Sequence, residues 1–85
     1  MKYDLLTEKK WKYLQKIYHL TPRELQVSQL VCNGLDNNKI SKELGIALGT
    51  VKTHLLNVYR RVRIKNKISL LLRFLEDIKK EGDDK

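Results

Sequence analysis

Two runs of helical periodicity, separated by a glycine, dominate the middle of this 85-residue sequence. In the first run, Asp36 can cap a helix, Ile40 and Leu44 point inward four residues apart, and Gly45 can end the helix in a left-handed conformation. The second run, over 48–62, has one stripe of apolar residues at i, i+4, i+7, i+8 and i+11: Val51, Leu55, Val58, Tyr59 and Val62. A short helix, a glycine turn and a longer helix predict a helix-turn-helix, whose second helix can enter the major groove of DNA.

Further helices are predicted on both sides of this pair. Thr21-Pro22-Arg23-Glu24 combines an N-cap, a proline at the first helical position and a glutamate that can complete a capping box, which predicts a helix over 22–33 that ends at Gly34. Asn66 can cap a helix over 67–80. That helix carries two apolar faces, so we expect one to face the core and the other, with Leu70 and Phe74, to face a second subunit, the alternative being one broad core face. The stripe expected to face the core is Ile68, Leu71, Leu72, Leu75 and Ile78.

The first 19 residues carry a weaker pattern. Trp11, Leu14 and Tyr18 fall at helical spacing with lysines opposite, which predicts an amphipathic helix of about three turns. Such a helix could cover the core, add to a dimer interface or form a linker, and the sequence does not choose among these roles.

Charge is the most informative bulk property. The net charge is +8, and residues 45–75 contain no acid but seven bases, namely Lys52, Arg60, Arg61, Arg63, Lys65, Lys67 and Arg73. Such a segment predicts a polyanionic partner. A single cysteine, Cys32, cannot close an internal disulfide, and the sequence offers neither a metal-ligand cluster nor a nucleophile with a base. We therefore expect a cytoplasmic protein that is not an enzyme, has no cofactor or metal and does not associate with membranes.

The string LGIALGTVKTHLLNVYRR at 44–61, together with Leu20-Thr21-Pro22-Arg23-Glu24 and Gly34, resembles the LuxR/GerE-type helix-turn-helix domain. The resemblance covers about residues 20–78. It implies a four-helix (tetra-helical) domain, a third helix that reads the major groove, a fourth helix that mediates dimer formation, and a role as a bacterial transcriptional regulator. The expected fold is thus all-α, with an N-terminal amphipathic helical extension at 1–19, the DNA-binding domain at 20–81 and a disordered tail at 82–85.

Four positions depart from the family pattern. Ala47 stands where a serine usually caps the recognition helix, which removes a cap at a cost of about 1 kcal/mol. Ser28 replaces an apolar core residue, Arg63 stands where Gly or Asn is common, and Leu56 stands where a polar residue is usual. These departures bear on stability and on sequence preference rather than on the fold.

The helical spacing and the resemblance together predict the contacts with DNA and with a partner subunit. The predicted base contacts are Lys52, Thr53, Leu56 and Asn57. The predicted contacts with the DNA backbone are Asn38, Lys39, Thr50, His54, Arg60, Arg61 and Lys65. The predicted dimer interface contains Leu70 and Phe74 on the helix 67–80.

The predicted function is therefore sequence-specific binding of double-stranded DNA as a homodimer that regulates transcription, with RNA polymerase as a further partner. Two alternatives stay open at the level of sequence. One is a module like region 4 of a sigma factor, which recognises promoter DNA together with polymerase. The other is a basic amphipathic module that binds proteins and not DNA.

Overall fold

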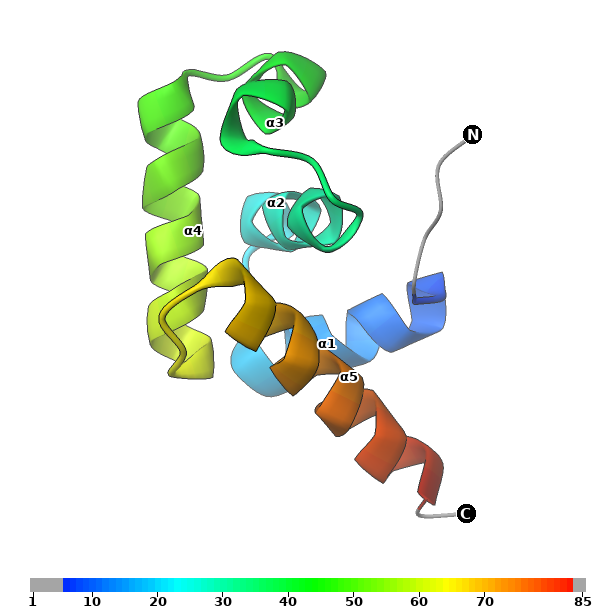
Figure 1. The fold of residues 1–85 in the computed structure, drawn as a ribbon. Coiled ribbons are helices and arrows are strands. Elements are labelled where there is room, and N and C mark those ends of the chain that lie inside the picture. The colour runs from blue at the N-terminus through cyan, green and yellow to red at the C-terminus, as the bar shows by residue number, and fades with distance from the viewer. Residues whose placement is uncertain (1–5, 84–85) are drawn as a thin grey trace.

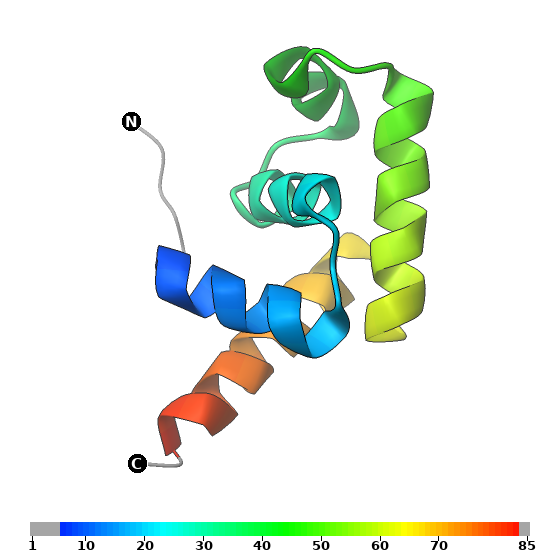
Figure 2. The same ribbon diagram turned by 180° about the vertical axis from the view of Figure 1, so that it is seen from behind.

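The computed structural model describes residues 6–83, and all of their regular structure is helical (Figure 1). The five helices are α1 (Glu8–Tyr18), α2 (Pro22–Cys32), α3 (Asn37–Leu44), α4 (Leu48–Val62) and α5 (Lys67–Asp83). In both views, α2, α3 and α4 lie together at one end of the molecule, while α1 and α5 pack against each other at the other end (Figure 1 and Figure 2). The all-α class and the central helix-turn-helix, formed by α3 and α4, are as predicted.

Side chains cap α2 and α3 as the sequence predicts. The backbone N–H of Glu24 donates to Thr21 Oγ1 at 3.1 Å, and the backbone N–H of Thr21 donates to Glu24 Oε1 at 2.9 Å, which completes a capping box at the start of α2. At the start of α3, Asp36 Oδ1 accepts a hydrogen bond of 2.8 Å from the backbone N–H of Lys39. Each cap satisfies backbone donors that the first turn of a helix leaves unpaired.

The turn into α4 and the end of α4 both use left-handed backbone. Gly45 has φ +65°, a conformation that costs glycine little, and it lets the chain leave α3 and enter α4. Ala47 makes no side-chain hydrogen bond to the first turn of α4, so the predicted loss of this cap is confirmed. At the other end, Arg63 has φ +64°, which costs a residue other than glycine about 1–2 kcal/mol.

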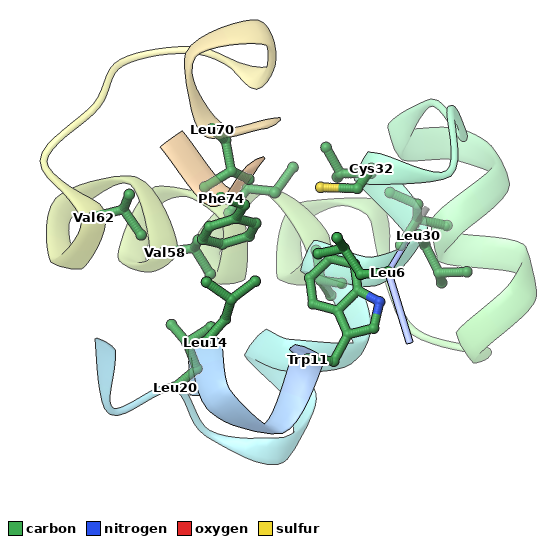
Figure 3. Packing of buried hydrophobic residues seen from close by; sticks show 14 of the residues in the cluster. Leu6, Trp11, Leu14, Leu20, Leu30, Cys32, Val58, Val62, Leu70 and Phe74 are labelled. Carbon is green, nitrogen blue, oxygen red and sulfur yellow. The ribbon is translucent and has the colours of Figure 1, made fainter. Parts of the chain in front are cut away.

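The core draws buried side chains from every helix (Figure 3). The rings of Trp11 and Phe74 meet edge to face, with centroids 5.8 Å apart, and so join α1 to α5. Ser28 lies fully buried in α2, and its hydroxyl has no hydrogen-bond partner within residues 6–83. The buried hydrophobic residues are Leu6, Trp11, Leu14, Leu20, Val27, Leu30, Val31, Cys32, Ile40, Val51, Leu55, Val58, Val62, Leu70, Phe74 and Ile78.

The first helix covers the core, which was one of its three expected roles. Helix α1 packs against α5 and α2 and buries Trp11 and Leu14 completely. Tyr18, at its last turn, donates a hydrogen bond to Asp77 Oδ2 on α5 and lies against the ring of Phe74, with centroids 6.0 Å apart. Residues 8–18 therefore share one core with the helix-turn-helix.

The assignment of the two apolar faces of α5 is wrong. Leu70 and Phe74, predicted at a dimer interface, are 0% exposed and pack inside their own chain. Of the stripe predicted in the core, Ile68, Leu72 and Leu75 are 73%, 60% and 40% exposed, whereas Ile78 is buried and Leu71 packs against the core as predicted. The physical reason is α1, because Trp11 and Tyr18 lie against Phe74 and draw its side of the helix inward.

The C-terminal end of α5 also differs from the prediction. The helix continues to Asp83, so residues 82 and 83 are helical rather than part of a disordered tail. Residues 84 and 85, the rest of that predicted tail, lie outside the described residues. Within residues 6–83, no helix is both long enough and apolar enough to span a lipid bilayer.

Candidate nucleic-acid interface

Helix α4 stands at one edge of the molecule in both views, with its outer side turned away from the other helices (Figure 1 and Figure 2). Its inner side is set by four buried residues at helical spacing, namely Val51, Leu55, Val58 and Val62. Those side chains face α2, α3 and α5, and the residues of α4 away from them, among them Lys52, Thr53, Leu56 and Arg60, are exposed. The outer face of α4 is therefore an exposed surface that runs along the 15 residues of this helix.

The four predicted base-contact residues lie on this outer face. Lys52 and Thr53 are exposed one turn into the helix, and Asn57 is half-buried one turn further on. The Thr53 hydroxyl donates to the carbonyl oxygen of Gly49 at 3.0 Å, so this side chain is held in place by its own helix. Leu56 is 48% exposed, which places it outside the core although it is a large apolar residue.

The residues predicted to contact the DNA backbone divide between α3, α4 and the segment after α4. Asn38 and Lys39 are exposed in the first turn of α3, next to the cap formed by Asp36. His54 is half-buried on α4. The remaining exposed members of the predicted set, apart from Arg61, are Thr50, Arg60 and Lys65.

Arg61 has a role inside the fold that sequence reasoning missed. Its guanidinium forms an ion pair of 2.8 Å with Glu24 Oε1, whose side chain is buried, and it also donates to the carbonyl oxygen of His19. The same Glu24 oxygen accepts the backbone N–H of Thr21 in the capping box of α2. Arg61 thus ties α4 to α2 through Glu24 and to the segment between α1 and α2 through His19. No local sequence signal marks a contact between residues 37 positions apart.

A groove runs along one edge of the outer face of α4. It is lined by Asn37 of α3, by Lys67 of α5 and by four residues of α4: Lys52, Leu55, Leu56 and Tyr59. Burial raises the pKa of the Tyr59 phenol above its ordinary value, and the nearby Cys32 raises it further. A phenol is a hydrogen-bond donor at neutral pH in any case. Lys67 was not among the predicted DNA contacts, because its position beside α4 depends on how the chain turns back between α4 and α5.

The described residues contain no group of three or more His, Cys, Asp or Glu side chains that could hold a metal ion. Cys32 is buried and forms no disulfide within this part of the chain. The basic outer face of α4, by contrast, is a surface on which a functional assignment can be built.

The match to a known family runs from Tyr18, the last residue of α1, into α5. The family described as "Bacterial regulatory proteins, luxR family" (GerE) matches residues 18–74. A predicted HTH-type transcriptional regulator in the exeN 3′ region of Aeromonas salmonicida is 41% identical over 59 residues, which cover 69% of this chain and 30% of that protein. The HTH-type transcriptional regulator MalT of Vibrio cholerae is 44% identical over 48 residues, covering 56% of this chain and 5% of MalT.

Among solved structures, the chain is similar to the response regulator StyR, known at low resolution. The TM-score is 0.65 at 33% identity, over 80% of this chain and 37% of the StyR chain. The chain thus spans less than half the length of each of these three proteins. The family is one of transcriptional regulators and not a class of enzymes. The match over 18–74 and the observed helices agree, and the chain therefore belongs to the luxR family of bacterial regulatory proteins, with the family's DNA-binding helix-turn-helix at its centre.

Proposed function

We propose that this protein binds duplex DNA by inserting α4 into the major groove and thereby regulates transcription. The observation that carries the proposal is the outer face of α4, which is basic and which no described helix covers. A helix about 10–12 Å across fits a major groove that is about 12 Å wide in B-DNA. Membership of the luxR family supports this function over a sigma-like module or a basic module that binds proteins.

Four residues of α4 would read the bases. Lys52 can donate to the O6 and N7 atoms of guanine, and the Asn57 amide can pair with the edge of adenine. Leu56 can pack against the methyl group of thymine, because nearly half of its surface is open. Thr53 offers its methyl group for the same kind of contact, since its hydroxyl donates to the helix backbone.

A second set would hold the DNA backbone and fix the register of α4 without reading sequence. This set contains Asn38, Lys39, Thr50, His54, Arg60 and Lys65. We leave Arg61 out, although the sequence suggested it, because its guanidinium already pairs with Glu24. The two exposed residues of α3 lie beside a helix N-terminus, whose partial positive charge adds to the attraction for a phosphate.

We also infer that two copies bind together through the exposed side of α5. Ile68, Leu72 and Leu75 are spaced at i, i+4 and i+7, so they form one apolar stripe on a helix whose other side is buried. A two-fold interface of this kind would place two copies of α4 on two half-sites of the DNA. A cytoplasmic location and contact with RNA polymerase stay predictions.

Selection of bound sequences from a pool of random duplexes, followed by binding titrations at several salt concentrations, tests the proposal. We expect affinity to fall steeply as salt rises, because phosphate contacts release counterions. Lys52→Ala should cost about 1–3 kcal/mol on the selected duplex and relax the sequence preference. Lys79→Ala, which removes an exposed lysine near the far end of α5, is the matched control. An affinity that changes neither with salt nor with Lys52→Ala would contradict the proposal.

A further inference from the structure

We propose that the groove between α3, α4 and α5 receives the sugar-phosphate backbone of one DNA strand, and that Lys67 contacts a phosphate there. This inference rests on the proposed insertion of α4 into the major groove. It assigns a DNA contact to α5, a helix whose proposed role is otherwise dimer formation. It also places a basic side chain from a separate part of the chain beside the recognition helix.

The first step of the argument is the position of the groove around the α4 axis. At 100° per residue, the core residues point to one side and Thr53 and Arg60 point nearly opposite. Lys52, Leu56 and Tyr59 then lie along one edge of the outer face, and Thr50, His54 and Asn57 lie along the other. A helix that fills a major groove has one DNA backbone on each side. The edge that carries Lys52 and Tyr59 therefore faces one of the two strands.

The second step is what lies beyond each edge. Beyond the edge with Lys52, the first residue of α5 brings Lys67 to the same groove. On the other edge, the one nearby arginine of α4, Arg61, is already held by Glu24. The groove thus joins two exposed lysines from separate helices, and neither forms an ion pair within the described part of the chain. Two such cations at one groove favour a ligand with regularly spaced negative charges.

The third step is the chemistry of the groove itself. Leu55 and Leu56 make part of its lining apolar, while Lys67 and the Tyr59 phenol can supply donors. A DNA strand offers matching groups, since deoxyribose has an apolar face and phosphate accepts hydrogen bonds. The side chain of Asn66 caps α5 by accepting the Ser69 N–H at 2.8 Å, so Lys67 extends from the ordered, electropositive start of a long helix.

The test compares Lys67→Gln with Lys79→Gln, two variants that each lose one exposed charge from the same helix. The probe is a duplex selected by the wild-type protein, and a scrambled duplex of equal length accompanies it. One lost phosphate contact lowers the slope of log affinity against log salt by about 0.9, which corresponds to about eightfold weaker binding near 0.1 M salt. We expect Lys67→Gln to show this change on both duplexes alike and Lys79→Gln to match the wild type.

Neutral methylphosphonate groups, placed one at a time along each strand, locate the contact. For the wild type and for Lys79→Gln, neutralising the phosphate beside Lys67 should weaken binding, whereas Lys67→Gln should be insensitive at that phosphate alone. If Lys67→Gln keeps the wild-type salt slope and the wild-type phosphate pattern, this inference is overturned while the proposed function stands. If the wild-type protein shows no salt-dependent binding of duplex DNA, the proposed function fails and the inference fails with it.

Discussion

At the scale of single residues, Arg60 and Arg61 show how one step along a helix separates two roles. Arg60 lies exposed in the last turn of α4 and belongs to the proposed contacts with the DNA backbone. Arg61 points back to the buried carboxylate of Glu24 and to the carbonyl oxygen of His19. Sequence alone grouped the two as equal phosphate contacts, because both belong to the same basic run.

We predict that substituting Arg61 lowers stability, whereas substituting Arg60 lowers affinity for DNA. Arg61→Ala should lower the free energy of unfolding by about 1–3 kcal/mol, because it leaves the buried Glu24 without its charged donor. Arg60→Ala should change the free energy of unfolding by less than about 0.5 kcal/mol but weaken DNA binding on all sequences. Urea denaturation and binding titrations on the same two variants measure both quantities. Equal effects of the two substitutions on stability would contradict the assignment.

Tyr18 predicts a dependence of stability on pH at the alkaline end. Burial and the hydrogen bond to Asp77 raise the pKa of this phenol from 10.0 to about 12. The neutral phenol therefore stabilises the folded state fully below pH 10, and this contribution is lost as the pH rises through 12. Between these values the midpoint of urea unfolding should fall more in the wild type than in Tyr18→Phe, which cannot ionise.

Tyr13→Phe, on the same helix, is the matched control for that measurement. It keeps Tyr18 and should therefore keep the wild-type fall in the midpoint. A fall of equal size in Tyr18→Phe would show that other groups account for the alkaline loss of stability.

At the scale of elements, α5 has one side in the core and one side open. Phe74→Ala should cost about 3–5 kcal/mol of unfolding free energy, because it empties a fully buried site beside Trp11.

Leu72→Glu should leave the helical circular dichroism signal intact while reducing cooperative binding to a paired site, because Leu72 is exposed in the single chain. Analytical ultracentrifugation and binding to one-site and two-site duplexes would check this. Unchanged cooperativity in Leu72→Glu would rule out this face as the interface.

The same helix shows how far the sequence can predict this structure. Local signals were sufficient for the helix ends, since the capping box at Thr21, the cap at Asp36 and the turn at Gly45 depend on residues a few positions apart. The two faces of α5 could not be assigned in this way, because each has helical spacing. The choice between them depends on which side α1 covers, and Trp11 meets Phe74 across 63 positions of sequence.

The candidate site divides along the same line. The outer face of α4 follows from its own apolar stripe, so Lys52, Thr53 and Leu56 could be placed from sequence. The groove beside it could not, because Lys67 reaches it only after the chain turns back at Arg63 with left-handed backbone. Contacts that join separate helices were the ones that sequence reasoning missed.

At the scale of the whole molecule, the fold extends beyond the family match. The match begins at residue 18, yet α1 supplies Trp11 and Leu14 to the common core. Removing residues 1–19 would uncover Phe74 and the neighbouring side of α5. The total free energy of unfolding of a domain is only about 5–15 kcal/mol, so we expect the loss of the buried contacts of Trp11 and Leu14 to abolish cooperative folding.

We therefore predict that residues 20–85 alone do not unfold cooperatively, and that Trp11→Ala in the full chain costs about 3–5 kcal/mol. Lys12→Ala, an exposed neighbour on α1, should change the unfolding free energy by less than about 0.5 kcal/mol. Thermal melts followed by circular dichroism compare the three proteins. A truncated chain with the melting temperature of the full chain would contradict this account of α1.

The position of Trp11 also equips the protein with an intrinsic optical probe. It is the one tryptophan of the sequence, and it lies 1% exposed against Phe74, away from the outer face of α4. Its emission should shift to longer wavelength when α1 separates from α5 and should stay unchanged when a ligand occupies α4. A single fluorescence titration can therefore distinguish a variant that has lost affinity for DNA from one that has lost its folded structure.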